Sequence, residues 1–196
     1  MKNTTTILTN TGDLYSRYGV SWEVHAAETG HNATELMNQA VIKQKLVNAP
    51  KPVLHSDNGS IMKSMTLKAK LESLGIQQSF SRPRVSNDNA YIESFFRTLK
   101  YVPNWPTKGF SDIEHARRWV QSFMGWYNEQ HLHSRLKFVT PGQRYRGEDK
   151  QILTKRAQVY EQAKAKNPAR WRSKVRDWTP IGAVALNPDN LERVNG

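Results

Sequence analysis

Short apolar runs of strand length alternate along this chain with longer segments whose apolar residues recur at helical spacing. Residues 18–26 alternate apolar and polar side chains, and residues 51–54 and 76–80 are two further runs of strand length. Helical spacing is found in residues 32–45 and 62–74. This alternation predicts an α/β domain with some parallel strand pairing, because a helix is the usual crossover between parallel strands.

The remaining segments add one weak strand and several helices. Residues 4–10 (TTTILTN) form the weaker strand candidate. Asn32 is expected to cap the helix at residues 32–45, and Ser111 a helix that runs to about residue 128. Further helices are predicted at residues 90–101 and 150–166, and Thr140-Pro141 begins a short turn or helix.

The charge balance points to a polyanionic partner. The chain has 29 Lys and Arg against 17 Asp and Glu, a net charge of +12, and no cysteine. Residues 135–176 hold 13 basic residues and three acids, with tyrosine and tryptophan interleaved. A solvated helix face is the ordinary explanation of a charge run, but a block this one-sided favours a phosphate-binding surface. Without cysteine or an apolar run of membrane length, a cytoplasmic protein is expected.

One acid follows a predicted strand among small polar residues. Residues 53–60 read VLHSDNGS, so Asp57 would lie at the carboxyl end of a strand, where open α/β sheets bind ligands. Gly59 lets the chain turn sharply there. An Asp-Asn-Gly sequence after a strand is, by itself, most often only a turn. His55 is expected to pack or hydrogen-bond beside this position.

A second acid lies in the helix segment NAYIESFFRTLK. Glu93 lies beside the apolar stripe of that helix, so it is expected to border the core and not to point freely into water, and 35 residues separate it from Asp57. This spacing can bring the helix back over the carboxyl edge of the sheet, where paired carboxylates can hold Mg²⁺. Arg97 and Lys100 follow Glu93 by about one and two turns, near the same face. The alternative is an ordinary surface pair between Glu93 and Arg97.

Three segments resemble those of a known family in their order, their residues and their spacing. LHSDNGS, SFSRPRVSNDNAYIESFFRTLK and WYNEQHLHSRLKFVTPGQRYRG look like the catalytic half (the orfB-like part) of bacterial insertion-sequence-3 type transposases. The resemblance runs from about residue 12 to the C-terminal region. It implies a ribonuclease H-like fold of the retroviral-integrase type.

The resemblance also implies roles for individual residues. In that family three acids, called DDE, bind two divalent metal ions, Mg²⁺ or Mn²⁺. Asp57 matches the second acid and Glu93 the third, and Lys100 matches a basic residue implicated in DNA binding. The implied activity is cleavage at element ends and joining of the 3′ hydroxyl to other DNA by in-line displacement. The implied partners are DNA, as element ends and target, and intact transposase or a second copy, with no membrane.

The sequence departs from the family at its start. The first acid of the family lies on a strand upstream of a segment that resembles residues 12–17 (GDLYSR), so that strand and its acid are expected to be missing here. Asp13 fits a turn better than this role. We therefore predict an integrase core that lacks its first strand at residues 1–149, and a basic helical extension at residues 150–196. Metal binding and transposition chemistry are expected to be impaired.

The lesser candidates are basic residues and histidines. Arg82 and Arg84, in the loop before the Glu93 helix, could contact phosphate, with plain solvation as the alternative. A metal site at His131 and His133 is disfavoured because no third ligand follows at zinc spacing.

Three functions remain open from the sequence. The leading one is a transposase catalytic-core protein. A second is a non-catalytic DNA-binding remnant that interferes with intact transposase. The third is a ribonuclease H-like nuclease, although the basic tail and the specific residues of the motifs argue against it.

Overall fold

The computed structural model describes residues 6–83, 85–184 and 186, and these form two compact units. The first unit holds residues 6–13, 19–123 except 84, and 186; the second holds residues 14–18 and 124–184. The domain boundary predicted after residue 149 lies inside the second unit and stays a prediction.

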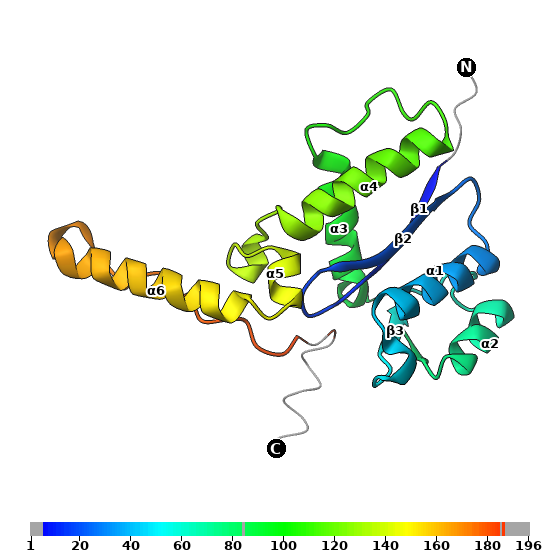
Figure 1. The fold of residues 1–196 in the computed structure, drawn as a ribbon, viewed down its shortest axis with the longest axis horizontal. Helices are drawn as coiled ribbons and strands as arrows, with labels where there is room; N and C mark the ends of the chain where they lie inside the picture. The colour runs from blue at the N-terminus through cyan, green and yellow to red at the C-terminus, as the bar shows by residue number, and fades with distance from the viewer. Residues whose placement is uncertain (1–5, 84, 185, 187–196) are drawn as a thin grey trace. The chain divides into compact units, whose positions relative to one another are not determined.

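Strands and helices alternate in the first unit, as the sequence pattern predicts (Figure 1). In chain order they are β1 (Ile7–Gly12), β2 (Gly19–His25), α1 (Gly30–Lys43), η1 (Leu46–Asn48), β3 (Val53–Ser56), α2 (Met65–Ser73), β4 (Gln77–Phe80), η2 (Ser86–Asn89), α3 (Ala90–Tyr101) and α4 (Ile113–Glu129). The last residues of α4 belong to the second unit, because the division falls after Phe123.

The four strands pair in twos within the described part of the chain. β1 and β2 are antiparallel, with Ile7 opposite His25, and the register shifts between Thr11 and Gly12. β3 and β4 are parallel, with His55 opposite Ser79, and α2 lies between them in the chain. The predicted parallel pairing is confirmed. The expected lack of a further upstream strand stays a prediction.

Helices α1 and α2 bury their apolar faces against each other and against Ile76, the residue before β4. Gly75, with φ +69°, ends the α2 segment, because this left-handed backbone conformation suits glycine and stops the helix. The chain can then enter β4 directly. The buried residues of this cluster are Ala33, Met37, Val41, Leu67, Leu71 and Ile76.

Two predicted helix caps are wrong by a few residues. Thr29 caps α1 in place of Asn32, because the Thr29 side chain accepts a hydrogen bond from the Asn32 backbone N–H. Asp112 caps α4 in place of Ser111: its Oδ1 accepts from the His115 N–H at 2.7 Å, and the Ser111 hydroxyl donates to Asp112. Each segment offers several side chains that can cap, and only the backbone path selects one.

The second unit is helical within its described residues, with η3 (Ser134–Leu136), α5 (Pro141–Tyr145), α6 (Asp149–Lys166) and η4 (Pro168–Arg170). Its apolar core consists of Leu136, Val139, Leu153 and Trp178. α5 begins with a full capping box, in which Thr140 and Gln143 each bond the backbone N–H of the other. The predicted short helix at Thr140-Pro141 and the basic helix before Asn167-Pro168 are both confirmed.

Two half-buried histidines follow α4 in this unit. The rings of His131 and His133 meet edge to face, with centroids 5.8 Å apart. The buried Nδ1 of His133 has no hydrogen-bond partner among the described residues. Burial, together with the nearby cations, lowers the pKa of His133 to about 4, and burial also lowers the pKa of His131. The other titratable or charged groups that act on His133 are His131, Arg17 and Arg135.

We expect the protein to lose stability as the pH falls from about 6.5 toward 4, because His133 must remain neutral in the folded state. The unfolded chain binds this proton near pH 6.5, so it binds more protons than the folded chain in that window. Because the ring is only partly shielded from water, we expect a loss of about 1–2 kcal/mol. Urea denaturation across this range should show a flatter pH dependence in His133→Gln than in the wild type. Equal slopes would contradict the prediction.

Candidate active site

A cavity of about 630 Å³ opens where β3 and β4 end. Asp57 and Asn58 follow the last residue of β3, and Ser81 and Arg82 follow the last residue of β4. The carboxyl ends of parallel strands are where ligands bind in α/β sheets, so this cavity is the candidate site. The cavity is lined by Asp57, Asn58, Lys63, Ser81, Arg82, Pro83, Val85 and Asn89.

Asp57 presents its carboxylate at this cavity without being covered by its neighbours. Ser56 is buried at the end of β3, whereas Asp57 is exposed. One carboxylate oxygen accepts the Gly59 backbone N–H at 3.0 Å, which fixes the orientation of the side chain. A Cβ on Gly59 would lie 3.0 Å from the same oxygen. The glycine therefore leaves room beside the carboxylate, and the small residues of VLHSDNGS serve both the turn and the access.

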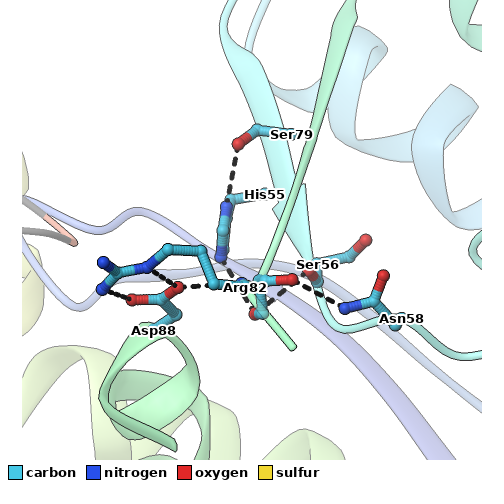
Figure 2. Close-up of polar contacts among 7 residues, drawn as sticks. His55, Ser56, Asn58, Ser79, Arg82 and Asp88 are labelled. Atoms are coloured by element: carbon cyan, nitrogen blue, oxygen red, sulfur yellow. Dashed lines mark hydrogen bonds and ion pairs between the residues drawn. The ribbon is translucent and has the colours of Figure 1, made fainter. Parts of the chain in front are cut away.

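Hydrogen bonds join the ends of β3 and β4, next to Asp57 in the chain (Figure 2). The ring of His55 bridges the two strands, with Nδ1 3.1 Å from the Ser79 hydroxyl and Nε2 3.2 Å from the Ser81 hydroxyl. The Ser81 hydroxyl also donates to the Ser56 carbonyl, and the Asn58 amide donates to the Ser81 carbonyl. The prediction that His55 hydrogen-bonds beside Asp57 is confirmed. The network holds both strand ends in place.

A buried acid that was not among the predicted site residues anchors the next loop. Asp88 accepts hydrogen bonds from the Arg82 backbone N–H and from two nitrogens of the Arg82 guanidinium, at 2.9–3.0 Å (Figure 2). These bonds from the Arg82 side chain and backbone lower the pKa of Asp88 to about 2. Arg82 therefore faces the cavity while it is held by Asp88. In the sequence, Asp88 stands in the stretch SNDN, where every residue is a candidate helix cap. The sequence therefore does not indicate which of the four residues binds Arg82.

Helix α3 carries the other predicted site residues on its exposed side. Glu93, Arg97 and Lys100 are exposed, while Phe95 and Leu99 are buried. The prediction that Glu93 borders the core is therefore wrong. Glu93 is not among the described residues that line the cavity, but Asn89 is, and Glu93 follows it by four residues, or one turn. Arg84 lies outside the described residues.

Within the described ranges, no group of three or more His, Cys, Asp or Glu side chains could hold a metal ion. Asp57 shares its cavity with two cationic side chains, Lys63 and Arg82, and with amide side chains. None of the helices in the described part of the chain is long and apolar enough to cross a membrane.

Two family models, both described as an integrase core domain, match residues 2–86 and 74–141. Together with the mixed α/β fold, these matches place the chain in the integrase-core class. The fold is similar to a chain of the simian T-cell lymphotropic virus intasome in complex with PP2A regulatory subunit B56 gamma. That match has a TM-score of 0.53 and 18% identity, and covers 72% of this chain and 49% of that chain.

The curated proteins that are similar in sequence to this chain include several named as transposases. A putative transposase InsK for insertion sequence element IS150 of Escherichia coli is 31% identical over 129 residues, or 66% of this chain and 44% of the relative. An uncharacterized transposase-like protein of Haemophilus influenzae is 29% identical over 66% of this chain and 58% of the relative. A putative transposase for IS986/IS6110 of Mycobacterium tuberculosis is 26% identical over 66% of this chain and 48% of the relative.

This chain belongs to the integrase-core transposases of insertion-sequence elements. It spans about half the length of the curated relatives it matches.

Proposed function

We propose that this chain is the catalytic-core part of a transposase, which cleaves DNA at the ends of its element and joins the 3′ hydroxyl to target DNA. The observation that supports this most is the exposed Asp57 at the carboxyl end of β3, in one cavity with Lys63 and Arg82. A carboxylate that shares a cavity with two cations suits a metal-bound phosphodiester, because the carboxylate would bind the metal ion and the cations would bind the phosphate oxygens.

The donors at this cavity fit Mg²⁺ or Mn²⁺. Asp57 offers a carboxylate, and Asn58 and Asn89 line the same cavity with amide side chains, so the donors are hard oxygens. Mg²⁺ keeps several water ligands and commonly takes only one or two carboxylates from the protein. Bound here, the ion would stabilise charge on the oxygens of the phosphodiester under attack.

Glu93 is the second carboxylate in this proposal. It lies one helical turn beyond Asn89, which corresponds to about 6 Å along the helix axis. Its exposure leaves the carboxylate accessible to an ion and to DNA. Arg97 and Lys100 follow on the exposed side of α3, where their cations would bind the DNA backbone and orient it.

The proposal is tested with Asp57→Asn and Glu93→Gln, which remove charge and keep shape. We expect the Mn²⁺-dependent strand transfer of an oligonucleotide that carries the element end to become about 100-fold slower or more in either variant, because each variant removes a proposed metal ligand. The affinity for Mn²⁺, measured from the relaxation of water protons, should fall in parallel. Glu72→Gln is the matched control, since Glu72 is exposed on α2 and makes the same charge change.

A second function has one observation in its favour. Within the described residues, no three acids or histidines gather into a metal site, so Asp57 and Glu93 have no third side-chain ligand of that kind there. This favours a DNA-binding protein without catalysis, which would interfere with an intact transposase. DNA binding without any metal-dependent strand transfer, unaffected by Asp57→Asn, would favour this function over the first.

A further inference from the structure

The most basic part of the chain forms an arm in the second unit. We define the arm as α6 together with residues 167–178. After α6 ends at Lys166, η4 turns the chain, and the following residues run back along α6 (Figure 1). Tyr160 contacts both Trp171 and Trp178 across this turn, with ring centroids 6.0 Å and 5.3 Å away. The tip of the arm is therefore a folded structure.

The cations of the arm fall into two groups. Arg156 and Arg176 lie over the ring of Trp178, and Arg156 also donates to the carbonyls of Lys137 and Phe138. Arg156 and Arg176 therefore hold the base of the arm in place. The second group stands at the tip and forms no ion pair with any residue that the structure describes. It consists of Lys164, Lys166, Arg170, Arg172 and Lys174.

No acid offsets the charge of the tip, since residues 162–176 contain neither Asp nor Glu. Along α6 from residue 158 to its end, every side chain is exposed except the half-buried Lys164. Five unpaired cations within eleven residues create a strongly positive potential at an accessible surface. A polyanion is the ligand that such a surface attracts.

A small cavity lies beside one of these cations, Arg170. It has a volume of about 330 Å³ and is lined by Ala163, Asn167, Arg170 and Trp171. Trp171 supplies a flat aromatic wall, Arg170 a planar cation, and Asn167 an amide that can both donate and accept. The side chain of Ala163 is small, so it leaves the ring of Trp171 accessible. These features match a flat ring with polar edges that is attached to a phosphate.

We propose that this cavity binds one unpaired nucleobase of DNA, stacked on Trp171, while the cations of the tip bind the neighbouring phosphates. The inference rests on the proposed function for its partner, DNA, and adds a preference for a strand with at least one unpaired base. Aromatic stacking accepts any base, and the phosphate contacts carry no sequence information. The arm therefore binds a strand end or a distorted duplex without reading its sequence.

The test compares a 20-nucleotide single strand with its duplex, each binding to the full chain. We expect Trp171→Leu to weaken single-strand binding roughly 10-fold or more, because stacking on one aromatic ring contributes that much. Duplex binding should change less than about 2-fold, since the phosphate contacts remain. Trp171→Phe should retain most of the single-strand affinity, because it keeps an aromatic face.

Charge changes along the same helix provide the matched control. Lys166→Gln, at the tip, should weaken the binding of single strand and duplex alike, whereas Lys155→Gln, exposed near the base of the arm, should change neither. Single-strand binding that is unaffected by Trp171→Leu overturns the inference. So does an equal loss for both DNA forms, or tight binding to anionic phosphatidylserine vesicles without any preference for DNA. Failure of the proposed catalysis is distinguishable, because it leaves these affinities unchanged and removes only strand transfer.

Discussion

Replacing Arg144 with methionine is expected to destabilise the protein by about 3–5 kcal/mol, a large part of the 5–15 kcal/mol typical of a folded domain. The guanidinium is 1% exposed and pairs with Asp149, which is equally buried, at 3.3 Å. It also donates to the carbonyls of Tyr15 and Ile181, at 2.8 Å and 2.9 Å, and lies over the Tyr15 ring. The variant leaves a buried carboxylate without its partner. Urea denaturation measures the loss.

Two control variants test whether the loss of stability comes from the burial of the charges and not from the loss of an ion pair alone. Arg146→Met removes ion pairs to Glu129 and Glu148 that are about half exposed, so it should cost at most about 1 kcal/mol. Adding Asp149→Leu to Arg144→Met should restore part of the stability, because no charge is then left buried without a partner. An Arg144→Met variant as stable as Arg146→Met would contradict the prediction.

Replacing Gly142 with alanine is expected to cost about 1–3 kcal/mol, because there is no space for a methyl group at that position. A Cβ there would lie 2.8 Å from the Asn128 carbonyl oxygen and 2.5 Å from a carboxylate oxygen of Glu129. The Glu129 side chain can move, but the Asn128 carbonyl is backbone. Thermal unfolding should show the loss as a lower midpoint.

Gly125→Ala is the matched control for this substitution. Gly125 lies within α4, and a Cβ built there meets no heavy atom within 4 Å. Alanine should therefore stabilise the helix by up to about 1 kcal/mol, because it restricts the unfolded chain more than glycine does. If both variants were destabilised equally, the close approach at Gly142 would not be the cause.

Much of the fold could be predicted because local patterns decide it. The alternation in residues 18–26 gives β2, and the helical spacing before Gly75 gives most of α2. The parallel pairing of β3 with β4 followed from the helix between them. The caps at Thr29 and Asp112 were not predicted, because several neighbouring residues can cap equally well.

The candidate site was predictable only in part. Asp57 could be placed at a strand end because the chain shows an apolar run followed by a turn. Lys63 and Asn89 were missed, because each is a single polar residue in a polar stretch, and only folding brings them to the cavity of Asp57. The exposure of Glu93 was wrongly predicted, since a position beside an apolar stripe can face either way until its neighbours are known.

The sequence by itself determined the order of strands and helices, the acid at the end of β3, and the concentration of charge in the arm. These follow from residue spacing and composition, which act over a few residues. Only the tertiary structure decided which side chains meet: Asp88 with Arg82, Arg144 with Asp149 and Tyr15, and Trp171 with Tyr160. Such pairings depend on burial and on the path of the backbone, which no local pattern specifies.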